Sequence, residues 1–402
     1  MGETFDVAVV GAGLVGLASA RALLGSRSCS VAVLEAEDRP AAHQSGHNSG
    51  VIHSGLYYRP GSLKARLCFE GRADLERYCE EHDVPWERCG KVVVATSKEQ
   101  LGALDELERR GAANGLDGIQ RLGPEGLRDH EPHVRGVEGL FVPHTGIVDY
   151  VALARAYARE VEQQGGSVLL RQAAGAIHRD GDSWRIETPK GELRARHLLN
   201  CAGANSDRVA RRAGLRPKAR IVPFRGEYKL LSEERSHLVR HLIYPVPDPR
   251  FPFLGVHFTR RIQGGIEAGP NAVLAFSRNG YRWGNVSPRD LLSMASFPGF
   301  WRMGLRYWRT GLGEMQRSLS AGAFARALAE LLPEVRREDL VPGGAGVRAQ
   351  ALGPDGKLLD DFHIETQPGA VHVLCAPSPA ATASLAIGAE IARRAQDWFA
   401  RS

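Results

Sequence analysis

The sequence predicts an α/β protein in which a domain with a parallel sheet is interleaved with a second domain built on an antiparallel sheet. Three observations support this. A strand, a glycine turn and a helix open the chain, which is typical of a parallel sheet. Short strands broken by proline and glycine dominate residues 220–277, which is typical of an antiparallel sheet. No repeat or low-complexity linker divides the 402 residues, so the domains are expected to alternate along the chain.

The first unit along the chain is β-α-β. Phe5–Val10 is a short apolar run that stops at Gly11, and it predicts a strand. Leu14–Leu24 is rich in alanine and leucine and contains no proline, so it predicts a helix. Val31–Leu34 is a second apolar run, and it ends on Glu35. This order predicts two neighbouring parallel strands joined by a helix.

The turn in this unit has the spacing of a Rossmann-like dinucleotide site. Gly11 permits the tight turn, Gly13 lets a phosphate approach the backbone, and Gly16 lets the helix pack closely on the strand. Glu35 stands where a carboxylate accepts hydrogen bonds from ribose hydroxyls. The acid argues against the 2′-phosphate of NADP but does not separate FAD from NAD.

Later segments continue the alternation of helices and strands, and they set the domain boundaries. Helices are predicted over 62–82, 98–114, 151–164, 288–332 and 381–400, strands over 91–96, 167–171, 197–201 and 371–375, and a hairpin over 176–188. The parallel-sheet domain is expected to take residues 1–90, 146–219 and 336–402. The antiparallel domain is expected to take residues 91–145 and 220–335.

Composition narrows the class of protein. The formal charge of +6 favours anionic partners, but no nucleic-acid motif is present, so nucleic acid is not an expected partner. No run of about 18 apolar residues predicts a membrane span, and the first ten residues do not resemble a signal peptide. The six cysteines form no CxxC pair and no metal-ligand cluster, so we expect reduced thiols, no metal and a cytoplasmic location.

The loop after the second strand carries the most specific motif. Residues 43–58 read HQSGHNSGVIHSGLYY and residues 60–65 read PGSLKA. This segment closely resembles the L-2-hydroxyglutarate oxidase or dehydrogenase family, which belongs to the D-amino-acid-oxidase-like group of FAD enzymes. Further matching blocks are FRGEY at 224–228, YPVP at 244–247, GVHFT at 255–259, GPNAV at 269–273, GVRAQ at 346–350 and APSPAAT at 376–382.

The resemblance implies FAD bound in an extended pose and oxidation of L-2-hydroxyglutarate to 2-oxoglutarate. The parallel-sheet domain is then the FAD-binding domain, and the antiparallel domain is the substrate domain. The cofactor contacts expected outside the first β-α-β unit are Ser45, His47, Asn48, Ser49, Ala202, Gly203, Gly346 and Pro377.

Oxidising a 2-hydroxy acid requires a base for the hydroxyl proton while a hydride passes to the flavin. Histidine suits this task because its ordinary pKa is about 6.5. His53 is the first candidate, in the glycine-rich loop that is expected to line the flavin, and His257 is a second candidate on the other side of a cleft. His47 is the third, although a structural role suits it better. Which histidine is the base stays open at this point.

A dicarboxylate substrate requires cations, and a guanidinium grips a carboxylate through two parallel hydrogen bonds. Arg225 and Arg348 both stand among small and apolar residues, where an unpaired charge is costly. The resemblance implies that at least one of them contacts the substrate. The alternative is a structural ion pair, for instance between Arg225 and Glu227. Tyr228 and Tyr244 are further hydroxyl donors.

Electrons must finally leave the flavin, and the sequence does not decide between a quinone and molecular oxygen as acceptor. Residues 291–312 interleave aromatic and basic side chains at helical spacing. Such a helix suits a peripheral contact with the inner face of the cytoplasmic membrane, or it simply packs on its own domain. Other functions remain open: a related FAD oxidase for another hydroxy acid or an amino acid, a non-catalytic flavoprotein, and a tRNA-modifying FAD protein.

Overall fold

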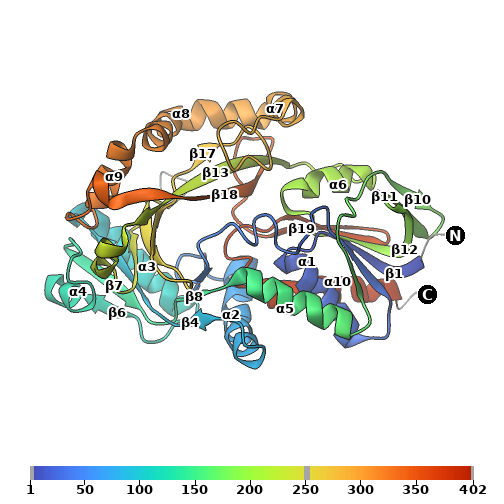
Figure 1. Cartoon of the computed structure of the whole chain (residues 1–402), viewed down its shortest axis with the longest axis horizontal. Coiled ribbons are helices and arrows are strands. Elements are labelled where there is room, and N and C mark those ends of the chain that lie inside the picture. Colours follow the sequence, from blue (N-terminus) through green and yellow to red (C-terminus); the bar gives the residue numbers. More distant parts are fainter. Residues whose placement is uncertain (1–3, 249–253, 400–402) are drawn as a thin grey trace.

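The computed structural model describes residues 4–248 and 254–399 (Figure 1). The predicted domain ranges also include residues 1–3, 249–253 and 400–402, which lie outside the described residues. Two large sheets lie side by side along the long axis, and the sheet near both termini has eight strands. The α/β class predicted from the sequence is confirmed.

The eight-stranded sheet contains the predicted β-α-β unit. Its order is β10-β11-β12-β1-β2-β9, with β20 beside β12 and β19 beside β20. The pairs β1–β12, β1–β2, β2–β9 and β12–β20 are parallel. Its strands are β1 (Thr4–Val10), β2 (Val31–Leu34), β9 (Ser167–Leu169), β10 (Ile177–Asp180), β11 (Ser183–Thr188), β12 (Gly191–Asn200), β19 (His363–Gln367) and β20 (Ala370–Cys375).

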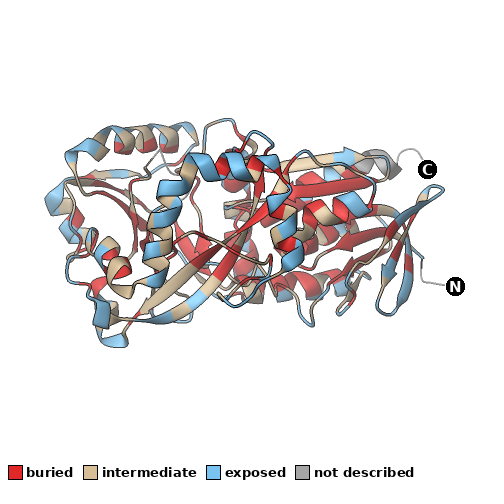
Figure 2. Cartoon of the chain, turned by 90° about the horizontal axis from the view of Figure 1, so that it is seen from above, coloured by how far each residue is buried: buried red, intermediate tan, exposed pale blue. Residues whose placement is uncertain are grey.

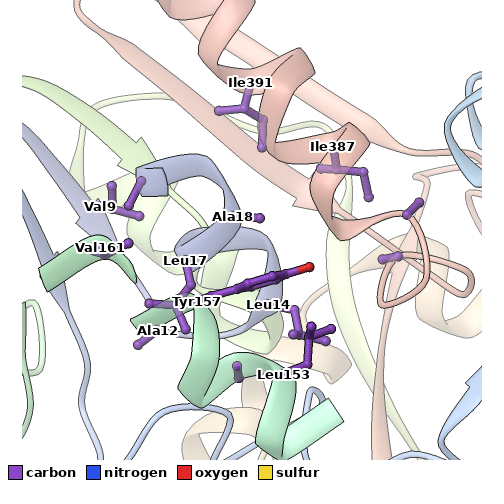
Figure 3. Close-up of a cluster of buried hydrophobic side chains, with 14 of the residues drawn as sticks. Val9, Ala12, Leu14, Leu17, Ala18, Leu153, Tyr157, Val161, Ile387 and Ile391 are labelled. Carbon is purple, nitrogen blue, oxygen red and sulfur yellow. The ribbon is translucent and has the colours of Figure 1, made fainter. Parts of the chain in front are cut away.

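Three helices pack together against this sheet and form its larger core. They are α1 (Leu14–Ser26), α5 (Tyr150–Gln163) and α10 (Ser384–Phe399). Val9, Leu17, Tyr157 and Ile387 meet between them (Figure 3), and all four are buried. Helix α6 (Ser206–Arg212) packs on β10, β12 and β20. Residues from four distant parts of the sequence therefore fix the position of the first glycine turn.

The nine-stranded sheet is antiparallel except where β14 runs parallel to β5. Its order is β17-β13-β16-β15-β14-β5-β7-β6, with β18 paired to β13. Its strands are β5 (Lys91–Ala95), β6 (Gln120–Leu122), β7 (Glu138–Val142), β13 (Arg220–Leu231), β14 (Leu242–Pro245), β15 (His257–Arg260), β16 (Ile266–Gly269), β17 (Val273–Leu274) and β18 (Leu340–Leu352).

The remaining elements connect and flank the two sheets. Strands β3 (Val51–Ile52), β8 (Gly146–Val148) and β4 (Trp86–Glu87) form a three-stranded sheet. Helices α2 (Leu63–Glu81), α3 (Leu101–Ala113) and α4 (Pro124–His130) precede three helices in a row: α7 (Pro288–Ala295), α8 (Pro298–Leu319) and α9 (Ala321–Ala329). Only Gly299 and Met303 of α8 are buried, so most of this helix is in contact with solvent (Figures 1 and 2).

Strand β18 belongs to the nine-stranded sheet. It lies within residues 336–402, which were predicted to be part of the parallel-sheet domain. It pairs with β13 from Arg220 opposite Leu352 to Leu231 opposite Leu340. The exact division of the chain into two domains stays a prediction, and this ladder shows that the third segment contributes to both sheets.

Candidate active site

One cavity of about 1480 Å³ runs from the glycine turn of β1 to strands β14 and β15 of the other sheet. Cavities that hold a drug-sized ligand usually measure about 300–1,000 Å³, so this one has room for more than a small substrate. Glu35 lines one end, and Tyr244 and His257 line the other. The cavity therefore joins the two sheets into a single site.

Gly11 and Gly16 are needed for the shape of the turn itself. Gly11 has a φ of +107°, and a Cβ there would lie 2.6 Å from the carbonyl oxygen of Cys201. A Cβ on Gly16 would lie 2.0 Å from the carbonyl oxygen of Gly11. Gly11 lines the cavity, whereas Gly16 is not among its lining residues and acts through the close packing of helix on strand.

The N-terminus of α1 opens onto the cavity, and its N-cap residue provides no capping side chain. Its N-cap is Gly13, its first turn contains no acid, and Gly13, Leu14 and Val15 line the cavity. Ser45 Oγ accepts a hydrogen bond from the Leu14 N–H at 3.0 Å. The free N–H groups and the positive end of the helix dipole suit a pyrophosphate.

Glu35 lies at the end of β2 and lines the cavity, as predicted for a ribose-binding acid. Its carboxylate also accepts hydrogen bonds from the backbone N–H groups of Ala12, at 2.8 Å, and Glu37, at 3.0 Å. The acid therefore holds the glycine turn as well as facing the cavity, a second task that its spacing did not reveal.

The loop at residues 45–49 is held by its own side chains. Asn48 donates to the carbonyl oxygen of Ser45 at 2.8 Å and accepts from the Gly50 N–H at 2.9 Å. His47 Nδ1 lies 3.0 Å from the His43 carbonyl oxygen, which fits the structural role considered for it. Ser45, His47, Asn48 and Ser49 all line the cavity.

The other predicted cofactor residues lie at the same cavity. Ala202, Gly203, Gly346 and Pro377 line it. A Cβ on Gly346 would lie 2.4 Å from the carbonyl oxygen of His47, so β18 approaches the loop too closely for any side chain there. The uncapped helix, the acid and these close backbone approaches match what an extended FAD needs, so the chain's residues fit this cofactor.

His257 begins β15 and has a defined tautomer. Its Nδ1 lies 2.8 Å from the carbonyl oxygen of Gly255, which only accepts, so Nδ1 carries the proton and Nε2 of the neutral ring is free of one. Burial lowers the pKa of His257 to about 3; the bond to Gly255 opposes this shift, and the charges of Arg348 and Lys91 add to it. The ring lies 4.0 Å from that of Tyr244, centroid to centroid.

His53 follows β3 and also lines the cavity. Its Nε2 lies 3.0 Å from the Ser378 hydroxyl, and its backbone N–H donates to Thr382 Oγ1 at 3.0 Å. Burial, followed by the charge of Lys91, lowers the pKa of His53 to about 3. Both histidines are therefore neutral near pH 7, the form in which imidazole accepts a proton.

Of the two arginines predicted to meet a substrate anion, only Arg348 is brought to the cavity. It lines the cavity from β18, together with Tyr228 of β13. Burial raises the pKa of Tyr228 to about 12, while the charge of Arg348 opposes the shift. The phenol of Tyr228 is therefore neutral near pH 7.

Arg225 is placed differently. Its side chain is 1% exposed, is not among the cavity-lining residues, and has Nη2 3.0 Å from Glu227 Oε1. Its guanidinium lies 4.1 Å from the centre of the Trp283 ring. Because Gly226 and Tyr228 face the cavity, side-chain alternation along β13 turns Arg225 and Glu227 to the opposite face. The ion-pair alternative describes Arg225 better.

Several cavity residues were not singled out from the sequence, although they belong to the matching blocks. Tyr57, Tyr58, Lys64 and Ser378 line the cavity beside the two histidines. Lys64 Nζ donates to the carbonyl oxygen of Asp360 at 2.7 Å. A single tyrosine, lysine or serine on a helix or loop does not by itself indicate a binding site. These four residues were indicated only by their positions within the motifs HSGLYY, SLKA and APSP.

Comparison with known proteins agrees with this geometry. Residues 6–394 match the DAO family of FAD dependent oxidoreductases. The chain is 50% identical over 397 residues to the L-2-hydroxyglutarate dehydrogenase of Indibacter alkaliphilus, covering 98% of this chain and 100% of that one. It is 44% identical to the mitochondrial L-2-hydroxyglutarate dehydrogenase of Homo sapiens, covering 99% and 90%, and 42% identical to that of Escherichia coli K12, covering 98% and 94%.

Solved structures show the same fold at lower identity. L-alpha-glycerophosphate oxidase from Mycoplasma pneumoniae, with FAD bound, has a TM-score of 0.81 and 22% identity, over 98% of this chain and 95% of that one. Glycine oxidase from Geobacillus kaustophilus has a TM-score of 0.69 and 18% identity, over 98% of each chain. The chain belongs to the DAO family of FAD-dependent oxidoreductases and, within it, to the family of the L-2-hydroxyglutarate dehydrogenases.

Proposed function

We propose that this enzyme oxidises L-2-hydroxyglutarate to 2-oxoglutarate. The observation that carries the proposal is a pair of neutral histidines beside Arg348, in the part of the cavity beyond the residues that suit FAD. The names of relatives at 42–50% identity support the choice of acid. FAD, when bound, supplies the acceptor for the hydride that leaves the substrate carbon.

We assign the base to His257. Its Nδ1 proton is held by the Gly255 carbonyl oxygen, so Nε2 is the nitrogen that takes the hydroxyl proton as the carbonyl of the product forms. His53 already shares its Nε2 with the hydroxyl of Ser378, which suits it to holding the substrate oxygen. The bound dicarboxylate brings negative charge close to both rings, and this raises the pKa of the proton acceptor.

Arg348 is the residue proposed to bind a carboxylate. It is the arginine that reaches the cavity next to both histidines, and its fixed charge contributes to their lowered pKa values. A guanidinium binds a carboxylate through two parallel hydrogen bonds, which also fixes the orientation of the acid. The substrate carbon is then held in one orientation, as selection of the L-isomer requires.

We further propose that a membrane quinone accepts the electrons, with α8 as the contact to the lipid surface. Trp301, Leu305 and Trp308 are 59%, 80% and 55% exposed on this helix, and arginines are interleaved with them. Arg306 and Tyr307 of the same helix line the cavity. An apolar face among arginines fits an anionic lipid surface on the cytoplasmic side, and it would place the cavity next to a lipid-dissolved acceptor.

No described helix is long and apolar enough to cross a membrane, so the proposed contact is peripheral. Molecular oxygen is the alternative acceptor. The two are separated by comparing turnover with a water-soluble quinone under argon with turnover in air and no quinone.

Product analysis tests the substrate. The purified holoenzyme, given L-2-hydroxyglutarate and a water-soluble quinone under argon, should form 2-oxoglutarate, identified by mass spectrometry, and should form none from the D-isomer. Turnover of another hydroxy acid or an amino acid in preference to L-2-hydroxyglutarate would contradict the proposal.

A further inference from the structure

A lysine lies buried behind the wall of the substrate region. Lys91 begins β5, is 1% exposed, and its side chain makes no hydrogen bond or ion pair with any residue that the structure describes. Its Nζ lies 4.4 Å from the centre of the Tyr57 ring and 5.2 Å from that of the Tyr244 ring. Both tyrosines line the cavity.

The groups around Lys91 provide no compensating negative charge. The neighbouring thiol of Cys68 on α2 has its pKa raised to about 12 by burial, so it is neutral. His53 and His257, whose own pKa values the charge of Lys91 lowers, are neutral as well. Burial lowers the pKa of Lys91 itself to about 7, because an unpaired ammonium is costly away from water.

A second observation points to a ligand at the same place. The hydroxyl of Tyr57 is buried and has no hydrogen-bond partner among the described residues, although its ring forms part of the cavity wall. The unpaired Tyr57 hydroxyl and the Lys91 amine, which lies over the same ring, are both stabilised when an acceptor with negative charge enters the cavity.

We propose that Lys91 is a positioning residue for the substrate: it takes up a proton from solvent when the dicarboxylate binds, and its ammonium then attracts the anion across the rings of Tyr57 and Tyr244. This inference rests on the proposed function, since it requires an anionic substrate in this part of the cavity. It adds, behind the permanent charge of Arg348, a charge that is only partial near pH 7 until the substrate binds.

The test compares the FAD-loaded wild type with Lys91→Met, Lys91→Arg and the control Lys98→Met, whose lysine is exposed. The half-saturating concentration of L-2-hydroxyglutarate for anaerobic flavin reduction is measured from pH 6 to pH 9. In the wild type it should rise above about pH 7, by up to about tenfold per pH unit. Lys91→Met should raise it about tenfold at pH 6.5 and flatten its dependence on pH.

Lys91→Arg should restore tight binding at pH 6.5 and keep it at pH 8.5, because a guanidinium stays charged. Lys98→Met should behave as the wild type. If Lys91→Met shows the wild-type half-saturation and pH profile, the proposal for Lys91 fails while the proposed reaction stands. If none of the four proteins is reduced by the acid, the proposed reaction itself fails.

Discussion

Two buried histidines determine how this site handles a proton. His53 follows β3 of the three-stranded sheet and His257 begins β15 of the nine-stranded sheet, but both line the cavity and both are neutral near pH 7. Both were predicted from the sequence as candidate bases, because His53 lies in the glycine-rich loop and His257 lies in the matching block GVHFT. The sequence could not decide between them, since the tautomer of His257 depends on the carbonyl of Gly255 in the folded chain.

Replacing His257 with Asn should slow anaerobic flavin reduction by about a hundredfold or more, the usual scale for losing a general base. Stopped-flow absorbance of the flavin measures this rate. His53→Asn should mainly raise the half-saturating concentration of substrate, because we assign it to holding the substrate oxygen. A larger loss of the maximal rate in His53→Asn than in His257→Asn would reverse the two assignments.

The same histidines should make the protein sensitive to acid. An unfolded histidine titrates near pH 6.5, whereas the folded pKa values lie near 3. The unfolded state therefore takes up protons first, so the stability that these rings contribute is full above pH 6.5 and is lost as the pH falls toward 3. Each ring should contribute a slope of about 1.4 kcal/mol per pH unit in that window.

Urea unfolding between pH 7 and pH 4.5 measures this slope. The double variant His53→Asn/His257→Asn should have a shallower dependence than the wild type, and His178→Asn, at an exposed histidine of β10, serves as the control. Equal slopes in all three proteins would show that the two rings are not the groups responsible.

The sequence does not show which of the two arginines faces the cavity. Arg225 and Arg348 have similar neighbours in the chain, but β13 turns Arg225 away from the cavity and β18 turns Arg348 toward it. Side chains alternate between the two faces of β13, so Arg225 faces away from the cavity once Gly226 and Tyr228 face toward it. Which face looks into the cavity is set by the whole sheet.

Arg348→Met should raise the half-saturating concentration of the dicarboxylate about tenfold or more with FAD content unchanged. Arg225→Met should leave half-saturation unchanged and lower the thermal midpoint, because breaking a buried ion pair costs about 3 kcal/mol or more. Flavin reduction and thermal unfolding separate the two effects. A shift in half-saturation only in Arg225→Met would contradict the placement of both residues.

At the level of elements, regular patterns were predictable and β18 was not. The first β-α-β unit and the helices over 288–332 stand out through their apolar periodicity, and the structure confirms them, the latter as three helices. Strand β18 reads LVPGGAGVRAQAL, and its proline and glycines are typical of a loop. It forms a strand because β13 pairs with it along its length, a long-range contact that local sequence does not show.

Helix α8 is the element that we propose to contact the lipid surface. Leu305→Glu/Leu312→Glu removes two exposed apolar side chains from the proposed lipid contact and should abolish sedimentation with vesicles of anionic phospholipid. The matched control Phe69→Glu/Val341→Glu changes exposed apolar residues on α2 and β18. If both double variants sediment with the vesicles as much as the wild type does, α8 is not the lipid contact. If the wild type itself does not sediment at low salt, the protein has no such contact.

For the whole molecule, the sequence predicted a parallel-sheet domain interleaved with an antiparallel-sheet domain, and the structure has two large sheets whose residues line one cavity. The glycine turn and Glu35 belong to one sheet, while His257 and Arg348 belong to the other. The matching motifs supplied many of the residues that line the cavity, although Arg225 of one motif does not line it. They could not predict the buried lysine behind the wall, since burial of Lys91 results from packing by α2, β14 and the loop after β3.

An anaerobic absorbance titration of the purified FAD enzyme tests the proposed oxidation of L-2-hydroxyglutarate. L-2-hydroxyglutarate is added in one series, and the D-isomer, lactate and several amino acids are added in others. The L-isomer alone should bleach the flavin absorbance, with one equivalent of 2-oxoglutarate formed for each flavin reduced. A yellow protein that none of these compounds bleaches, or that an amino acid bleaches instead, would contradict the proposed reaction.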